Sequence, residues 1–305
     1  MPTEARARER AGVLLAAIGA LGYGVTVVVG EDLADSGLGS TTALGVRFLI
    51  SGVMLALVLR LRGKRIFASK RHVVVGLALG AGYAVQATLF FSALERGTAA
   101  AASLVFYVYP AMVTIYEVAR GRERLTRAMA VALTLSTAGT AVVVVAGGEL
   151  ALTPAGLLFA LGSAATFAAY LIIGRNLTHS YDPMGVACFV ALGAGVVNIA
   201  RGAATAQLTN PSSRLAELVL YGAATAVAFT LTFAAMNLIG AARVAVVMTL
   251  EAVSSVIMAA VFLGESVGIG QALGGAMVLG AAVVIARSQP ADIPTATEVA
   301  PAAGT

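Results

Sequence analysis

Long apolar runs alternate with short polar breaks along almost the whole chain. Each run is long enough to cross the hydrocarbon core of a bilayer, which takes about 20 mostly apolar residues. The breaks are too short to hold a soluble domain, so consecutive helices are expected to be antiparallel neighbours. The pattern predicts an all-α polytopic membrane protein whose ten transmembrane helices cover residues 11–30, 41–59, 73–94, 98–119, 128–147, 154–174, 183–200, 215–238, 242–263 and 268–286.

The composition excludes several other classes of protein. Of the 305 residues, 59% are hydrophobic and 11% are charged, whereas a soluble domain carries roughly 25% charged residues. One cysteine rules out a disulfide within the chain and cysteine-based metal sites, and the two histidines form no catalytic motif. No pair of aspartates, His–Glu pair or Ser–Lys pair lies within a predicted span. We therefore expect no enzyme activity, no cofactor, no metal and no nucleic-acid partner.

The basic residues set the orientation, because cytoplasmic loops of membrane proteins carry an excess of Lys and Arg. With both termini inside, 16 of the 20 basic residues lie in cytoplasmic segments, three lie outside, and Arg47 lies within a span. We expect a multi-pass protein of the cell inner membrane with a cytoplasmic N-terminus at 1–10. The Pro-, Ala- and Thr-rich segment 288–305 is predicted to be a disordered cytoplasmic tail. Because tryptophan is absent, Tyr181 and Tyr221 are expected at the membrane interfaces.

The second half of the chain repeats the first. AGVLLAAIGA near the start of the chain matches AGLLFALGSA near the start of the second half, and an offset of 142 residues aligns the break at 121–123 with the break at 263–265. The predicted repeats, 11–147 and 154–287, contain five spans each. An odd number of spans places the second repeat inverted in the membrane. In secondary transporters, inverted repeats enclose a substrate site near the bilayer midplane, so a central cavity is predicted.

This plan resembles the drug/metabolite transporter superfamily, EamA type. In each half a helix leads to a polar break and then to a final Gly-rich span, and the breaks are Gly121-Arg122-Glu123 and Leu263-Gly264-Glu265. Glu251-Ala252 stands where the family often has Glu-Pro, and the first half holds Tyr109-Pro110 there. The resemblance implies a transporter that alternates between inward-open and outward-open states around a central cavity. Family members export amino acids, other metabolites or drugs, and carriers of sugars and nucleotide sugars are relatives.

Three ionisable residues within predicted spans are candidates for function, because isolated charges are costly at bilayer depth. Glu251 lies about 13 Å into its span at 1.5 Å per residue, where it would bind a substrate ammonium group or a proton, or form a structural salt bridge. Arg47 keeps its charge at any accessible pH, so it would hold a substrate carboxylate or pair with a carboxylate such as Glu251. Opposite charges in one cavity would suit an amino acid. Glu117 is expected to form a surface ion pair at the cytoplasmic end of its span.

Neutral polar and aromatic side chains recur at helical spacing on several spans, which places them on shared faces. Such faces would line a cavity for a medium-sized ligand, or they would hold neighbouring helices together. Pro110 removes a backbone hydrogen bond and is expected to kink the fourth span, either as a hinge or as a static bend. The predicted translocation path consists of Arg47, Tyr83, Gln86, Tyr107, Tyr109, Thr166, Tyr170, Thr230, Asn237, Glu251 and Ser254.

Together these features predict a secondary, alternating-access transporter that exports small metabolites, with amino acids as the first candidates. A multidrug or cationic-compound exporter is the alternative within this class, and a passive membrane channel is the alternative from a different class. The expected partners are a small-molecule substrate and the lipid bilayer, and the protein is expected to act as a monomer. Proton coupling would depend on Glu251 alone, so proton-coupled transport and facilitated diffusion are equally compatible with the sequence.

Overall fold

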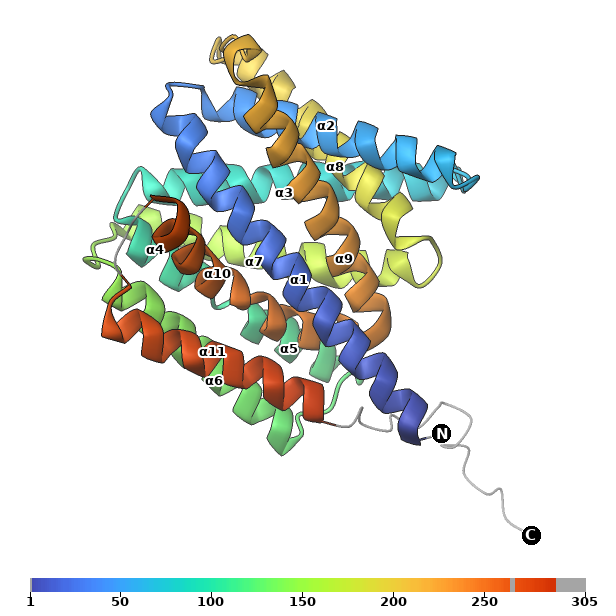
Figure 1. Cartoon of the computed structure of the whole chain (residues 1–305), viewed down its shortest axis with the longest axis vertical. Coiled ribbons are helices and arrows are strands. Elements are labelled where there is room, and N and C mark those ends of the chain that lie inside the picture. The colour runs from blue at the N-terminus through green and yellow to red at the C-terminus, as the bar shows by residue number, and fades with distance from the viewer. Residues whose placement is uncertain (1, 264–266, 289–305) are drawn as a thin grey trace.

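The computed structural model describes residues 2–263 and 267–288, whose regular structure is helical apart from one isolated β-bridge (Figure 1). The predicted all-α fold is confirmed. The predicted polar break at 264–266 and the predicted tail from 289 onward lie outside the described residues. The helices are α1 (Pro2–Asp35), α2 (Ser40–Leu61), α3 (Lys70–Leu94), α4 (Ala99–Phe106), α5 (Tyr109–Ala119), α6 (Arg127–Ala146), α7 (Pro154–Thr178), α8 (Pro183–Ala204), η1 (Ser212–Arg214), α9 (Leu215–Met248), α10 (Leu250–Met258), η2 (Ala259–Leu263) and α11 (Ile269–Arg287).

Nine helical segments of the described chain are long and apolar enough to span a membrane. The remaining predicted span, 242–263, is divided among the end of α9, the short α10 and the π-helical turn η2. This span begins just after Gly240, whose φ of 80° lies in the left-handed region that glycine adopts without steric strain. Gly240 therefore turns the chain between the eighth and ninth predicted spans, although α9 continues to Met248.

Two of the spans are broken at equivalent positions in the two repeats. Helices α4 and α5 meet at 107–108, and helices α9 and α10 meet at Thr249. The offset of 142 residues carries Tyr107, the C-cap of α4, onto Thr249, the C-cap of α9. The kink expected at Pro110 is thus a break, and Pro110 lies in the first turn of α5, where a missing N–H costs no helical hydrogen bond. Discontinuous helices of this kind form substrate sites in inverted-repeat transporters.

The repeats pack together through matching helix pairs (Figure 1). Helix α1 packs along α9 and α3 packs along α7, and the repeat symmetry exchanges these two pairs. Helix α2 packs on α8 and α6 packs on α11, so each of these pairs joins equivalent helices. Small residues allow the last pair to approach closely, because a Cβ at Gly139 would lie 2.8 Å from the carbonyl oxygen of Gly274. This is the packing expected of two inverted repeats.

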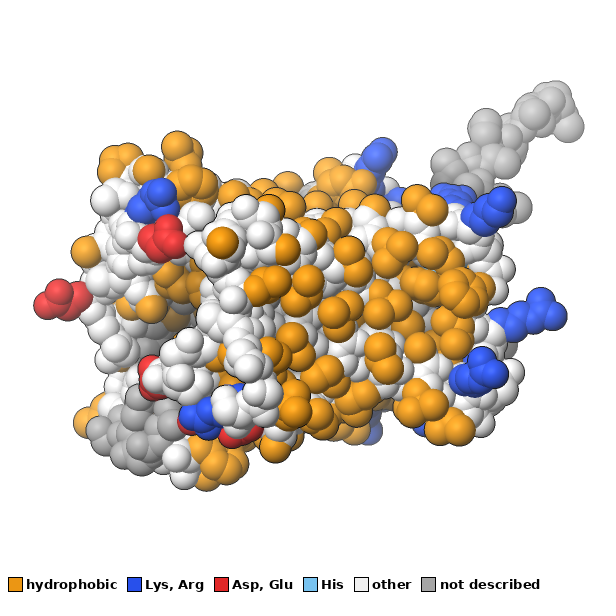
Figure 2. Space-filling view, turned by 90° about the horizontal axis from the view of Figure 1, so that it is seen from above, with side chains coloured by type: hydrophobic (Ala, Val, Ile, Leu, Met, Phe, Trp, Pro, Cys, Tyr) orange, Lys and Arg blue, Asp and Glu red, His pale blue; other side chains and the backbone are white. Residues whose placement is uncertain are grey.

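The surface divides into a hydrophobic middle and two charged ends. Figure 2 shows hydrophobic side chains across the middle of the visible face and charged side chains gathered toward its ends. We call the end with the loops 62–69, 120–126 and 179–182 the basic end, and the end with the loops 95–98 and 147–153 the opposite end. A broad apolar band between charged ends is the surface that a bilayer requires.

Candidate functional site

A cavity of about 480 Å³ extends from the two helix breaks toward the opposite end of the bundle. Its mouth is formed by the end of α3, the start of α4 and the end of α6, represented by Leu94, Ala99 and Gly147. Aromatic rings and aliphatic side chains make up most of its wall, with few polar groups among them. This mixture is typical of small-molecule binding sites, whose volumes are about 300–1,000 Å³.

Four residues of the predicted path line this cavity. They come from three different helical segments, and two of them lie at or next to the helix breaks. Gln86 is held in place by its amide group, which donates a hydrogen bond of 2.9 Å to Ser163 Oγ. The four residues are Tyr83, Gln86, Tyr107 and Glu251.

Glu251 provides the carboxylate in the cavity wall. It lies in the first turn of α10, where the positive end of the helix dipole favours a negative charge. Among the described residues, no Lys, Arg or His nitrogen lies within 4.0 Å of its carboxylate. The structural salt bridge considered from the sequence is therefore not formed with any described residue. The carboxylate is placed to receive a cationic group from the cavity.

Arg47 is buried beside the cavity but does not line it. Its guanidinium lies 4.3 Å from the ring centre of Phe48 and 4.4 Å from that of Tyr221, so two rings stabilise the charge. Tyr83 lies beside Arg47 and lines the cavity, so this tyrosine connects the charge to the site. Tyr221, expected at a membrane interface, is instead buried at 5% exposure because it covers Arg47.

Tyr109 lies at the inner limit of the cavity rather than in its wall. Its side chain is fully buried, and its hydroxyl donates a 3.4 Å hydrogen bond to the carbonyl oxygen of Ala245 in α9. Its ring packs edge-to-face on Phe167, with 4.7 Å between the ring centres. Since Phe167 lines the cavity, Tyr109 and Ala245 form a contact between the repeats that closes the cavity toward the basic end.

The remaining predicted path residues are used for packing or lie elsewhere. Thr166 donates a hydrogen bond to the carbonyl oxygen of Gly162 in its own helix. Ser254 donates one to the carbonyl oxygen of Ala20 in α1, so it joins two helices. Tyr170 is buried among aromatic rings, Thr230 has a buried hydroxyl, and Asn237 is exposed at the basic end.

Several cavity residues were not among the predicted path residues. Tyr23 in α1, Ser255 in α10 and Gln271 in α11 all line the cavity. Ser255 follows Glu251 by four residues, so helical spacing alone would have placed it on the same face. Tyr23 has the polar residue Thr26 three positions on, so helical spacing could have marked that face of the first span. Gln271 has no polar neighbour at helical spacing, so its position follows only from the packing of α11.

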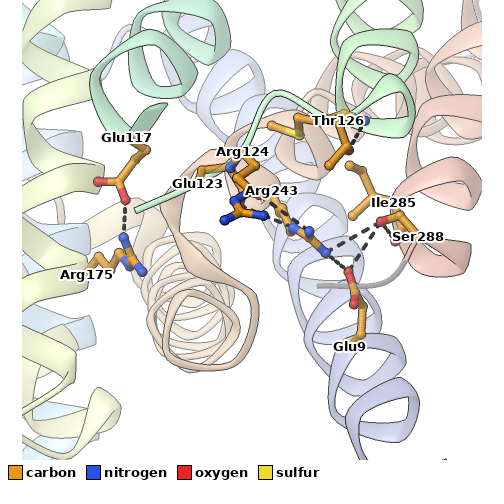
Figure 3. Close-up of polar contacts among 10 residues, drawn as sticks. Glu9, Glu117, Glu123, Arg124, Thr126, Arg175, Arg243, Ile285 and Ser288 are labelled. Atoms are coloured by element: carbon orange, nitrogen blue, oxygen red, sulfur yellow. Dashed lines mark hydrogen bonds and ion pairs between the residues drawn. The ribbon is translucent and has the colours of Figure 1, made fainter. Parts of the chain in front are cut away.

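A second cavity, of about 320 Å³, lies at the basic end and has a different chemistry. Its lining includes four arginines and three glutamates, and several of them form ion pairs (Figure 3). Glu117 pairs with Arg175 at 1% exposure of the Glu117 side chain. The prediction that Glu117 forms a surface ion pair was therefore wrong about its location, because α7 covers the carboxylate. Within the described residues, no group of three or more His, Cys, Asp and Glu is arranged to hold a metal.

Comparisons with known proteins agree with this architecture. The EamA-like transporter family model matches the chain twice, over residues 10–145 and 154–287. None of the curated proteins compared with the chain matches it significantly. One solved crystal structure superposes on this chain with a TM-score of 0.74. The superposition covers 93% of this chain and 98% of the other chain. At 20% identity, that likeness supports the fold alone.

The two family matches coincide with the two repeats, and together they cover nearly all of the described chain. The helix pairs, the two broken spans and the cavity between them fit the same plan. The chain belongs to the EamA-like transporter family and is a membrane transporter of the drug/metabolite transporter type.

Proposed function

We propose that this transporter exports amino acids or closely related small amines across the cell inner membrane by alternating access. The observation that carries the proposal is Glu251, a carboxylate in the wall of an aromatic cavity with no ion-pair partner among the described residues. A charged group in such a place is costly unless a ligand or proton uses it. An ammonium group is the simplest ligand that would form an ion pair with this carboxylate.

The rest of the cavity would bind the body of such a substrate. The rings of Tyr23, Phe106 and Phe167 offer apolar contact and attraction for a cation. Gln86, Tyr107 and the first turn of α10 are hydrogen-bond donors within reach of a carboxylate. Arg47 lies next to Tyr83, outside the cavity wall, and adds a permanent positive charge near the site. The cavity therefore suits a zwitterion with an apolar or aromatic side chain.

The orientation is part of the proposal. The loops of the basic end would lie in the cytoplasm, in agreement with the excess of Lys and Arg in cytoplasmic loops. The main cavity would then open to the outside, and the second cavity would face the cytoplasm. In each transport cycle the Tyr109–Ala245 contact would separate, so that the site becomes accessible from the basic end and closed at the opposite end.

A second candidate is an exporter of monovalent organic cations. The aromatic wall and the lone carboxylate favour it, because cations without a carboxylate also satisfy Glu251. Competition assays separate the two candidates. An amino acid that competes better than the matching amine without its carboxylate supports the amino-acid exporter, and the reverse order supports the cation exporter.

The main test is counterflow in proteoliposomes. Vesicles preloaded with an unlabelled amino acid should accumulate the same radiolabelled amino acid transiently, whereas a passive channel gives no such trans-stimulation. Glu251→Gln should reduce this accumulation about 10- to 100-fold, because a charge-assisted interaction is lost. Glu95→Gln, at a 72% exposed side chain near the cavity mouth, is the matched control and should retain it. Unchanged flux in both Arg47→Ala and Glu251→Gln would overturn the proposal.

A further inference from the structure

Three buried ion pairs at the basic end join one repeat to the other (Figure 3). Arg243 in α9 pairs with Glu9 in α1 and, at 3.3 Å, with Glu123 in the loop 120–126. Arg175 in α7 pairs with Glu117 in α5. All three acids come from the first repeat or its N-terminal extension, and both arginines come from the second. Every one of these pairs must therefore break if the two repeats separate at this end.

These pairs are withdrawn from water. The side chains of Glu9, Glu117 and Arg243 are at most 5% exposed, that of Glu123 is 10% exposed and that of Arg175 is 17% exposed. Removing one partner of a buried pair leaves an uncompensated charge, which is far more costly than losing an exposed pair. The closed arrangement of the basic end is thus stabilised by charges that water does not screen.

The loop 120–126 connects the two ion-pair groups. Glu123 in this loop binds Arg243, while Arg122 lies 3.8 Å from Glu117 and donates a 3.1 Å hydrogen bond to Asn176 beside Arg175. The loop follows α5, the helix that begins at the first break. A movement of α5 would therefore be transmitted to both groups.

The path from the ion pairs to the cavity is continuous. Tyr109, Val113 and Glu117 are spaced four residues apart on α5, so they lie on one face. All three are buried, and this face runs from the inner limit of the main cavity to the second cavity. The buried part of α5 is therefore the barrier between the two cavities.

Among the described residues, which leave out 264–266, the opposite end shows no equivalent arrangement. The offset of 142 residues places Ala101 where Arg243 stands, and the offset of 144 that aligns the first helices of the repeats places Glu31 where Arg175 stands. Neither residue supplies a positive charge. Among the described residues, the ion pair between the repeats at that end is Arg214–Asp32, at 3.6 Å and with side chains 33% and 53% exposed. The buried pairs thus belong to one end of the pseudo-symmetric bundle.

We propose that Arg175 and Arg243, with Glu9, Glu117 and Glu123, form an inter-repeat latch that holds the basic end closed while the main cavity is open. The inference rests on the alternating-access mechanism proposed above. Release of the latch admits substrate from the basic end. Because the buried inter-repeat pairs of the described residues lie at the basic end, the transporter rests with its main cavity open at the opposite end.

Thiol labelling of the purified protein in detergent tests the latch without any substrate. Cys188 is buried and donates to the carbonyl oxygen of Gly52, so Cys188→Ser gives a background that retains the donor. Two single-cysteine reporters are then made in it. Val113→Cys reports opening of the barrier, and Ser255→Cys reports access to the main cavity. A charged, water-soluble thiol reagent gives the labelling rate of each.

The latch is broken with Glu9→Gln and Glu123→Gln together, which retain side-chain size. The labelling rate at Val113→Cys should rise about tenfold while that at Ser255→Cys falls several-fold, because the two states exchange population. Arg243→Lys retains the charge and should shift both rates less. Asp32→Asn, which breaks the exposed pair at the opposite end, is the matched control and should change neither.

The outcomes distinguish control of access by the latch from general loosening of the fold. They do not depend on which substrate is transported. Opposite changes at the two reporters support the latch. A rise at both reporters indicates general unfolding, and no change at either indicates that the ion pairs do not control access; both results overturn it. Since no amino acid is present, a failure here is distinct from a failure of the amino-acid counterflow assay.

Discussion

The two broken helices occupy equivalent positions in the repeats but carry different chemistry. At the first break Tyr109 is fully buried and its hydroxyl contacts the carbonyl oxygen of Ala245. At the second break Glu251 lies in the cavity wall, in the first turn of α10. The repeat therefore reproduces the interruption of the backbone, while only one copy places a charge beside the cavity. Tyr109 closes the site and Glu251 faces into it.

The proline also differs between the two breaks. Pro110 occupies the first turn of α5, and its equivalent in the second repeat is Ala252, whose N–H donates a 3.1 Å hydrogen bond to the carbonyl oxygen of Thr249. The second break forms without proline, so proline is not required for an interruption at this position of the repeat.

The largest effect is expected for Glu251→Gln. Loss of a charge-assisted interaction costs about 1.5–3 kcal/mol, so transport of an amino acid should fall about 10- to 100-fold. Tyr109→Phe removes a polar group at the equivalent position and should leave the transport rate within about threefold, because its hydroxyl bonds to protein. Initial rates in proteoliposomes measure both. Equal losses of transport rate in the two variants would contradict the proposal that Glu251 binds substrate while Tyr109 closes the site.

A moderate loss of stability is expected for Tyr109→Phe. The variant leaves the carbonyl oxygen of Ala245 without its 3.4 Å donor, which should lower the free energy of unfolding by about 0.5–1 kcal/mol. Thermal unfolding in detergent measures the change. Tyr107→Phe is the control on the cavity side: it should alter substrate affinity and leave the melting temperature nearly unchanged.

A smaller loss is expected for Pro110→Ala. Removing proline gives the unfolded chain more freedom, which should cost about 0.4–1 kcal/mol. If Pro110 also serves as a hinge, the maximal transport rate will change as well. Pro183→Ala, at the start of the unbroken helix α8, is the matched control and should lower stability alone. Identical transport in both variants would show that the bend at Pro110 is static.

The smallest effect is expected for Ala252→Pro, which makes the second break resemble the first. It removes the hydrogen bond to Thr249 and restricts the unfolded chain, so the two effects should offset to within about 1 kcal/mol. Val256→Pro in the middle of α10 should cost about 3 kcal/mol or more. Comparable losses in the two variants would mean that Ala252 does not lie at a true helix start.

Part of the site followed from local sequence patterns. The i to i+3 spacing placed Tyr83 and Gln86 on one face of α3, and both line the cavity. The depth of Glu251 followed from its distance along an apolar run. The same reasoning failed to separate Ser254, which bonds to α1, from Ser255, which lines the cavity. A shift of one residue turns a side chain by about 100°, and only the packing of α10 against α1 sets that rotation.

The sequence by itself determined the membrane class, nine of the ten predicted spans, the two repeats and a family of transporters, because these depend on the length and order of apolar runs. Only the tertiary structure decided what the two breaks do. The burial of Tyr109, the placement of Arg47 between two rings, and the pairing of Glu9 with Arg243 all join residues from different helices. Hydrophobic periodicity is a local property, whereas these contacts depend on how helices far apart in the chain rotate and cross.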